Sequence, residues 1–284
     1  MKICVFKHAS GERHVGLVEE DQVKDLTLAG ISKLSDILES ESHLSAASEA
    51  GSRATEAYPL SETTLLAPIE AQEVWAAGVT YMRSKTARME ESDFSAIAYD
   101  KVYEAPRPEI FFKAVAEKVV GTGDQVGIRR DATWNVPEPE LALVFNSKGI
   151  LVGATIGNDM SSRDIEGENL LYLPQAKVYD RSAGLGPWIV LGESEEAMRE
   201  WTVDLRITRD GEIGFEGTTA INQIKRSFTE LKDYLFASQT FSKGAILMTG
   251  TGVVPGDDFT LQAGDVVRIE ISGIGVLENE VTVV

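Results

Sequence analysis

The sequence predicts an α+β fold that is mainly β, in which a small N-terminal domain precedes a larger β-rich domain. From Val74 onward, short apolar runs with the two-residue period of strands follow one another, punctuated by glycine. Helical patterns do not alternate regularly with these runs, which argues against a doubly wound sheet or a TIM barrel. We therefore expect a mixed, mainly antiparallel β architecture. With 43% hydrophobic and 25% charged residues, the chain of 284 residues has the composition of a globular protein.

The N-terminal part combines strand and helix patterns. Short β patterns occur at Ile3–Phe6 and Val15–Val18, and a helical pattern covers Ile31–Leu38. The segment His43–Ala57 is rich in Ala, Ser and Glu, so it packs weakly if it is helical. Pro68 begins a connector after this part. The expected domains are residues 1–67 and 68–284.

The second domain is expected to consist mainly of strands. Seven apolar runs are predicted as strands: Val74–Ala77, Ile110–Phe112, Leu141–Phe145, Ile150–Ile156, Trp188–Leu191, Val203–Ile207 and Val266–Ile271. Three helical patterns interrupt them, at Ser84–Tyr103, Ser194–Trp201 and Ile221–Ala237.

Charge and composition exclude several classes of protein. The chain has 45 acidic and 27 basic residues, a formal net charge of −18, so its surface repels nucleic acid and anionic lipid. No run approaches the roughly 18 apolar residues that span a bilayer, and the N-terminus lacks the apolar core of a signal peptide. We expect a cytoplasmic protein that binds neither nucleic acid nor membranes. The single cysteine, Cys4, excludes an intrachain disulfide and a thiolate metal cage, and is expected in the core.

The three histidines lie within the first 43 residues. His8 and His14 flank the turn of a predicted hairpin, and together with His43 they are expected at the surface. If the chemistry lies further along the chain, it must proceed without imidazole. Ser-His-Asp triads and histidine-ligated zinc are then excluded.

Three carboxylates are predicted to converge in the β-rich part. Glu138 and Glu140 are two residues apart, so along a strand they point to the same side. A turn at residues 146–149 and a second apolar strand bring Asp159 back beside this pair. A bare Glu-x-Glu also suits a solvated edge, but the buried-looking run that follows argues against one. All-oxygen ligation favours Mg²⁺, with Mn²⁺ or Ca²⁺ as alternatives.

Two lysines are candidates for offsetting this charge or for taking part in chemistry. Lys113 follows an apolar strand and shares a face with Phe111 and Glu109. Lys177 follows a loop that contains Pro174. A lone lysine is most often an ordinary surface ammonium, but the face that Lys113 shares argues against this interpretation for Lys113.

The order of these motifs resembles that of the fumarylacetoacetate hydrolase superfamily, from Val74 to the C-terminus. The residues that carry the resemblance are Pro108–Lys113, Glu138–Leu141, Gly157–Asp164, Lys177 and Thr249–Thr251. The resemblance implies a mixed β-roll catalytic domain behind a small N-terminal domain. It also implies Mg²⁺ held by Glu138, Glu140 and Asp159, and a homodimer or homotetramer.

Within the superfamily, three segments are most similar to members that dehydrate 2-keto-3-deoxy sugar acids: Arg107–Lys113, Trp134–Val144 and Asp159–Tyr179. The implied reaction converts a 2-keto-3-deoxypentonate to 2,5-dioxopentanoate in pentose and sugar acid catabolism, by removal of a C3 proton and loss of the C4 hydroxyl. The resemblance nominates Lys177 and Glu109 as the catalytic acid and base, without saying which is the base. It implies substrate contacts by Arg163, Thr251, Lys113 and Tyr81.

Two departures from the superfamily pattern bear on the reaction. The His-Glu dyad that activates water in hydrolases and decarboxylases is missing from the corresponding stretch, Thr80–Ala87, and Glu166 replaces a usual glutamine. The missing dyad favours a dehydratase. One alternative is a C–C bond hydrolase or decarboxylase that acts on an acylpyruvate-like diketo acid with the same metal. The other is a non-catalytic interaction protein whose carboxylates bind Ca²⁺ only to brace the fold.

Overall fold

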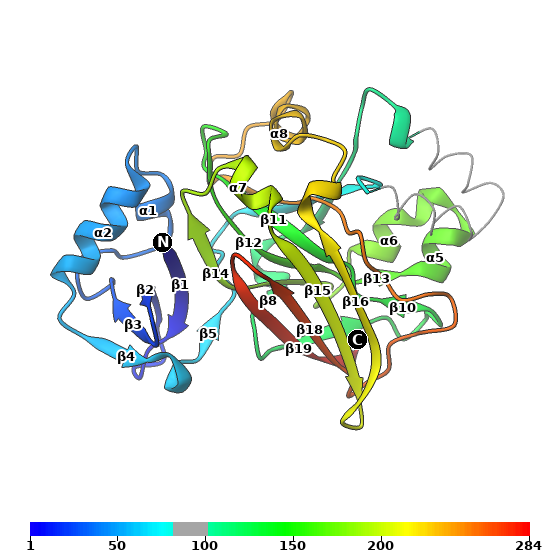
Figure 1. The fold of residues 1–284 in the computed structure, drawn as a ribbon, viewed down its shortest axis with the longest axis horizontal. Helices are drawn as coiled ribbons and strands as arrows, with labels where there is room; N and C mark the ends of the chain where they lie inside the picture. Colours follow the sequence, from blue (N-terminus) through cyan, green and yellow to red (C-terminus); the bar gives the residue numbers. More distant parts are fainter. Residues whose placement is uncertain (82–101) are drawn as a thin grey trace.

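The computed structural model describes residues 1–81 and 102–284 and confirms a mainly β fold with mixed sheets (Figure 1). A 12-stranded sheet runs through the molecule in the order β4-β3-β2-β1-β14-β12-β11-β17-β6-β7, with β5 paired to β1 and β8 to β14. A 5-stranded sheet has the order β16-β15-β18-β19-β9, and β10 pairs with β13. The helix predicted over Ser84–Tyr103 falls largely on residues 82–101, which lie outside the described residues.

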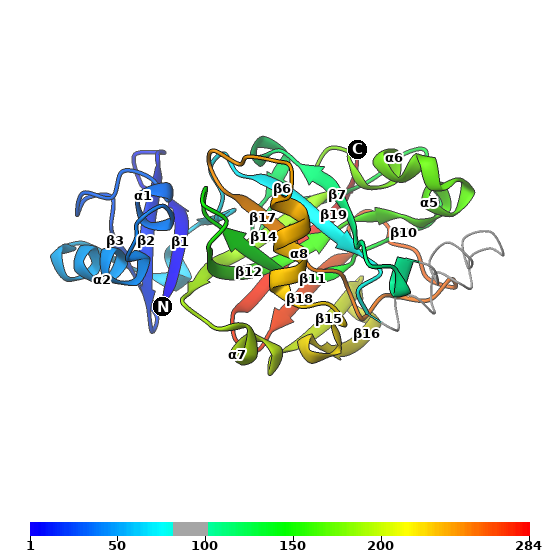
Figure 2. The same ribbon diagram turned by 90° about the horizontal axis from the view of Figure 1, so that it is seen from above.

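The N-terminal part is an antiparallel sheet with two helices on one face (Figures 1 and 2). Its elements are β1 (Lys2–Lys7), β2 (Arg13–Glu19), β3 (Gln22–Asp25), α1 (Ser35–Leu38), α2 (His43–Arg53), β4 (Ala57–Pro59), η1 (Leu60–Glu62) and β5 (Leu65–Leu66). The first helix is shorter than the predicted Ile31–Leu38. The helix α2 buries only small residues, namely Ala47, Ala50 and Gly51.

The long sheet continues from the N-terminal part into the β-rich part. Strand β1 pairs antiparallel with β14 (Ala183–Leu191), with Ile3 opposite Ile189. One apolar cluster joins residues of both parts, among them Ile37 of α1 and Val144 of the central sheet. The division at residues 67 and 68 stays a prediction, and the structure shows that the two sides share a sheet and a core.

The β-rich part builds the rest of the two sheets. Its strands in the long sheet are β6 (Glu73–Gly78), β7 (Glu109–Ala114), β8 (Val119–Val120), β11 (Pro139–Phe145), β12 (Leu151–Asp159), β14 and β17 (Ala245–Met248). The second sheet holds β9 (Gln125–Ile128), β15 (Thr202–Arg209), β16 (Glu212–Ala220), β18 (Val266–Ile271) and β19 (Gly275–Val283), and the small pair is β10 (Asn135–Val136) and β13 (Ser161–Ser162). Each of the seven predicted strands is present.

The described helices of the β-rich part are short, and Figure 2 shows the longest of them, α8 (Phe228–Phe236), crossing over the strands of the long sheet. These helices are η2 (Ala116–Lys118), α5 (Arg163–Glu168), η3 (Leu170–Tyr172), α6 (Leu173–Lys177), α7 (Glu195–Arg199), η4 (Ile221–Gln223) and α8. The prediction of one helix over Ile221–Ala237 is wrong in its first half, where η4 and an extended residue precede α8. No helix among the described residues is long and apolar enough to cross a membrane.

Strand β11 is buried on both faces, as its continuous apolar run predicts. Leu143 belongs to the core between the two sheets, together with Leu205 and Ile269, whereas Val144 belongs to the core that the N-terminal helices cover. Because it is buried on both faces, the strand is a rigid support for the side chains at its N-terminal end.

The expected burial of Cys4 is confirmed, whereas the expected exposure of the histidines is not confirmed for all three. Cys4 is buried as expected, and burial raises the pKa of its thiol to about 12. The expectation that the histidines lie at the surface is wrong for His14, which is 5% exposed. His14 is buried because Asp25 lies beside it and accepts a hydrogen bond from its ring.

We expect Leu143→Ala to lower the free energy of unfolding by about 2–5 kcal/mol, because it leaves a cavity between the two sheets. Urea unfolding measures the change. Leu171→Ala is the matched control: Leu171 is 83% exposed, so its truncation should change stability by no more than about 0.5 kcal/mol. Equal effects of the two substitutions would contradict this account of the core.

Candidate metal centre and active site

The hairpin of β11 and β12 brings three carboxylates together. Glu138 and Asp159 are opposite one another, since each backbone NH donates to the other's carbonyl, at 3.3 and 2.9 Å. Glu140 is two residues along on the same side. Carboxylate oxygens of Glu138, Glu140 and Asp159 lie within 4.8 Å of one another, as the spacing in the sequence predicts. Their role as metal ligands stays a prediction.

These carboxylates are buried, which makes their negative charge costly. Their exposed fractions are 3% for Glu138, 2% for Glu140 and 1% for Asp159. Burial raises the pKa of Glu140 well above its usual value, and the charges of Asp159 and Glu138 raise it further. The group therefore requires positive charge or hydrogen-bond donors around it.

Lys177 supplies one positive charge from the end of α6. Its Nζ lies 2.8 Å from Glu138 Oε2 and 3.1 Å from Asp159 Oδ2, and donates to Ser161 Oγ at 2.5 Å. The side chain is 1% exposed, so the interpretation as a surface ammonium is wrong. Ser161 was not among the predicted site residues. Its position two residues after Asp159 on an extended segment is the signal that points to the same side.

Lys113 supplies a second positive charge from β7 and is fully buried. Its Nζ lies 2.6 Å from Asp159 Oδ1 and donates to the carbonyl oxygens of Met160, at 3.0 Å, and Lys177, at 2.5 Å. Burial lowers the pKa of Lys113, and the neighbouring Asp159 opposes this shift. With three acceptors, Lys113 holds Asp159 and the backbone at Lys177 in place.

Backbone groups complete the surroundings of the carboxylates. The NH of Gly250 donates to Glu140 Oε2 at 2.6 Å. Gly250 has φ +91°, and a Cβ there would lie 2.0 Å from Thr80 Oγ1. Only glycine fits this position without displacing a neighbour. The sequence alone did not assign Gly250 a role, because Glu140 lies 110 residues away along the chain.

Glu109 lies at the edge of the site. It is opposite Gly78 in the pairing of β7 with β6, and its side chain is half-buried. A Cβ on Gly78 would lie 2.0 Å from Glu109 Oε2, so the carboxylate lies over this glycine. Gly78 also lines the cavity described below.

The remaining predicted residues lie around this centre. Arg163 places Nη1 3.3 Å from Glu138 Oε1, and its guanidinium lies 5.5 Å from the centre of the Trp134 ring. Thr251 lines the cavity, and its hydroxyl donates to the carbonyl of Val253 at 3.0 Å. Tyr81 is buried against Gly252 rather than in the cavity lining; burial and the charge of Glu140 raise its pKa. Most of the stretch expected to lack the His-Glu dyad, residues 82–87, lies outside the described residues.

A small cavity lies between these groups, with a volume of about 10 Å³. It is lined by Ala77, Gly78, Val79, Phe111, Glu138, Glu140, Asp159, Lys177, Gly250 and Thr251. This is about the space of one water-sized sphere. Three oxygen donors around such a space fit a hard divalent cation such as Mg²⁺.

Comparison with known proteins gives consistent results. The profile of the family described as Fumarylacetoacetate (FAA) hydrolase C-terminal matches residues 73–282. A "Probable 2-keto-3-deoxyxylonate dehydratase" of Haloferax volcanii is 49% identical over 217 residues, which cover 76% of this chain and 74% of the relative. A "2-dehydro-3-deoxy-D-arabinonate dehydratase" of Saccharolobus solfataricus is 40% identical over 223 residues, 78% of this chain and 75% of the relative.

A solved structure matches along the whole chain. It is described as "2-keto-3-deoxy-D-arabinonate dehydratase complexed with magnesium and 2,5-dioxopentanoate". It has a TM-score of 0.82 and 32% sequence identity, and covers 100% of this chain and 99% of that one.

We expect Gly250→Ala to weaken Mg²⁺ binding about 10–100-fold, because the new Cβ displaces Thr80 or the NH that holds Glu140. Isothermal titration calorimetry measures the affinity. Gly264→Ala is the matched control, since Gly264 has a similar φ of +89° but no atom within 4 Å of the added Cβ. Both variants carry the same backbone strain, so equal Mg²⁺ affinities would contradict the role assigned to Gly250.

We expect the affinity for Mg²⁺ to fall as the pH is lowered past the raised pKa of Glu140. Because this pKa lies above the usual value of a carboxyl group, the fall should begin at a higher pH than an ordinary carboxylate ligand would cause. Glu140 must lose its proton to bind the ion, and burial favours the protonated form. In metal-free protein the folded state holds this proton more tightly than the unfolded state, so the same shift increases stability as the pH falls. Calorimetric titration with Mg²⁺ from about pH 8 to about pH 5.5 tests the sign. An affinity that stays constant over this interval would contradict the raised pKa of Glu140.

Proposed function

Because the chain belongs to the fumarylacetoacetate hydrolase family, we propose that it is a Mg²⁺-dependent dehydratase that converts a 2-keto-3-deoxypentonate to 2,5-dioxopentanoate and water. One observation carries the proposal. A buried group of three carboxylates shares a cavity with the ammonium of Lys177, and the carboxylate of Glu109 lies at its edge. An acid and a base beside a metal site are what elimination of water from a keto acid requires.

In this proposal Glu138, Glu140 and Asp159 hold the Mg²⁺. When bound, the ion polarises the keto group of the substrate and makes the C3 hydrogens more acidic. Lys113 keeps Asp159 in position through its ion pair. The ammonium of Lys113 already contacts three oxygen atoms, which supports this positioning role rather than the substrate contact that the resemblance implies.

Lys177 and Glu109 are proposed as the acid and the base. One group takes the C3 proton and the other gives a proton to the departing C4 hydroxyl, which leaves as water. A double bond then joins C3 and C4. A proton shift from C5 to C3 moves this double bond to C4 and C5 and gives an enol, and transfer of the enol hydroxyl proton to C4 yields the C5 aldehyde. Lys177 lines the cavity from α6, and Glu109 of β7 lies over Gly78, which also lines the cavity, so the two groups come from different elements.

The distribution of histidines supports a dehydratase over a hydrolase. The dyad that activates water for C–C cleavage needs a histidine, and the sequence has three, all in the first 43 residues. His8 follows β1, His14 lies in β2 and His43 begins α2. None of the described residues that line the cavity is a histidine.

The other parts of the proposal rest on less specific observations. Arg163 and Thr251 are proposed to bind the substrate carboxylate, for which a guanidinium and a hydroxyl near the cavity are suited. The substrate contact that the resemblance implies for Tyr81 stays a prediction, since Tyr81 is buried against Gly252. A cytoplasmic location, assembly as a homodimer or homotetramer, and the absence of nucleic-acid or membrane partners stay predictions.

The activity is tested by incubating the protein with Mg²⁺ and 2-keto-3-deoxypentonates of both C4 configurations. We expect 2,5-dioxopentanoate by mass spectrometry, no product with EDTA, and a loss of at least about 100-fold in turnover for Lys177→Ala. Lys148→Ala is the control, because Lys148 has a side chain that is 60% exposed. Cleavage of an acylpyruvate into two fragments, without dehydration of either pentonate, would instead identify a C–C bond hydrolase.

Exchange of the C3 hydrogens with D₂O distinguishes the base from the acid. The variant that lacks the base should lose both exchange and dehydration, whereas the variant that lacks the acid should still exchange but not dehydrate. Lys177→Ala and Glu109→Gln are compared by NMR, with Glu117→Gln as an exposed carboxylate control. Normal dehydration by both Lys177→Ala and Glu109→Gln would overturn the assignment of this pair.

A further inference from the structure

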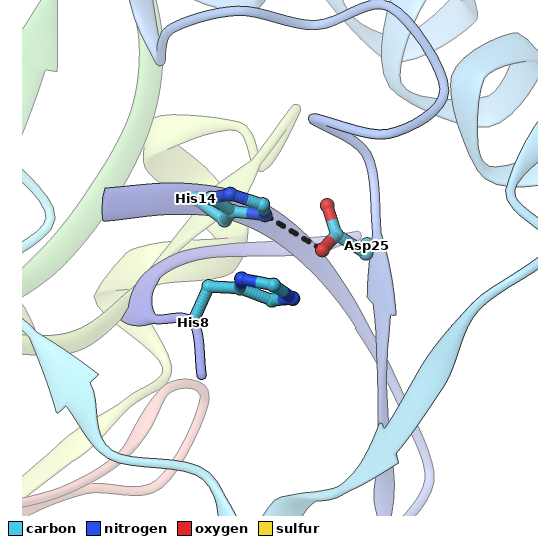
Figure 3. Close-up of side chains that lie close together, drawn as sticks. All are labelled: His8, His14 and Asp25. Carbon is cyan, nitrogen blue, oxygen red and sulfur yellow. Dashed lines mark hydrogen bonds and ion pairs between the residues drawn. The ribbon is translucent and has the colours of Figure 1, made fainter. Parts of the chain in front are cut away.

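A second cluster of metal-ligating side chains lies in the N-terminal sheet, apart from the proposed active site (Figure 3). His8 follows β1, His14 lies in β2 and Asp25 ends β3. One ligand atom from each lies within 4.8 Å of the others. Two imidazoles and one carboxylate, from the end of β1 and from β2 and β3, thus lie close together.

The pair of His14 and Asp25 is the rigid half of this cluster. His14 Nδ1 lies 2.7 Å from Asp25 Oδ2, and the two residues are 5% and 0% exposed. The other carboxylate oxygen of Asp25 accepts from the backbone NH groups of Thr27, at 2.9 Å, and Leu28, at 3.1 Å. These two bonds orient the carboxylate so that Oδ2 faces the imidazole.

His8 is the adjustable half. Its ring is stacked on that of His14, with centroids 4.3 Å apart and 3° between the planes. Ser10 contacts Nδ1 of His8 through its hydroxyl, at 2.9 Å, and its backbone NH, at 3.2 Å, so Nε2 is the nitrogen left for another partner. Figure 3 shows the outer end of this ring on the same side as Asp25. His8 is half-buried just before a turn, so part of its ring is open to solvent and an ion can approach it from that side.

We propose that His8, His14 and Asp25 form a binding site for a transition-metal ion of the zinc class, such as Zn²⁺, Ni²⁺ or Cu²⁺. Two imidazoles and one carboxylate suit these ions, whereas Mg²⁺ prefers oxygen ligands. Ligand atoms bind Zn²⁺ at about 2.0–2.2 Å, which puts two ligands of a tetrahedral ion about 3.4 Å apart. His14 Nδ1 and Asp25 Oδ2 are now 2.7 Å apart, so a small separation of this pair lets both bind one ion. The ion replaces the shared proton, and the ring of His8 turns out of its stack on His14 so that Nε2 faces the ion.

The environment favours such a site. The rings of Phe6 and Tyr58 lie 5.8 Å from His14 and 6.0 Å from His8, so apolar surfaces border the ligands. With three protein ligands, a fourth position is left for water. An ion held here links β1, β2 and β3, and it stabilises the N-terminal sheet because the three ligands converge only in the folded chain.

Metal titration of tag-free, chelator-treated protein tests the proposal, with excess Mg²⁺ present to saturate the acidic centre. We expect one further Zn²⁺ per chain in equilibrium dialysis. Cu²⁺ in its place should give an electron paramagnetic resonance spectrum split by imidazole nitrogen, which an all-oxygen centre cannot produce. His8→Gln should weaken Zn²⁺ binding by at least about tenfold and remove part of the nitrogen splitting.

His43→Gln is the matched control, since it removes the histidine that is not in the cluster and should leave both readouts unchanged. His8→Gln keeps the buried pair of His14 and Asp25, so the variant should fold and should dehydrate the substrate at the rate of the unmodified protein. His14→Gln is less informative, because it breaks that buried pair. The proposal is overturned if Cu²⁺ shows oxygen ligation alone, if His8→Gln binds Zn²⁺ unchanged, or if His43→Gln removes the nitrogen splitting.

Discussion

Three carboxylates buried within 4.8 Å of one another are the constraint on which the rest of the β-rich part depends. Like charges at this separation, shielded from water, destabilise a fold unless cations or hydrogen-bond donors surround them. Lys113 and Lys177 lie on two sides of Asp159, and the NH of Gly250 donates to Glu140. The buried ammonium groups are explained by the same balance, because neither would be stable in an apolar core alone.

This balance explains why most of the site is held by neighbouring strands. The hairpin of β11 and β12 fixes the acids, β7 carries Lys113 and Glu109, and the segment after β17 brings Gly250. Neighbouring strands hold their side chains at set positions, and β11 is itself buried on both faces. Glycines at 78 and 250 are required where a carboxylate or a hydroxyl approaches the backbone. Groups so held are already in place for acid–base chemistry.

The chain presents two different sets of ligands. The centre in the β-rich part offers oxygen atoms and is surrounded by ammonium groups, which suits a hard ion at a site of reaction. The cluster in the N-terminal sheet offers imidazole nitrogens beside aromatic rings, which suits a softer ion in a bracing role. The two sets lie on one continuous sheet, since β1 pairs with β14, yet their chemistries are separate.

What the sequence by itself determined is what depends on short separations along the chain. The strand period and the turn after Phe145 place Glu138, Glu140 and Asp159 together, and apolar runs locate the main strands. Among the longer strands of the β-rich part, the prediction left out β9, β16, β17 and β19. In β16, glutamates and glycines obscure the period, and half of a predicted helix is irregular. Only the tertiary structure decided the partners of Lys113, the role of Gly250 and the burial of His14. These depend on contacts between residues far apart or in neighbouring strands, such as the 110 residues between Gly250 and Glu140. The local pattern of apolar and polar residues does not predict these contacts, because the packing of the whole chain decides which strands become neighbours.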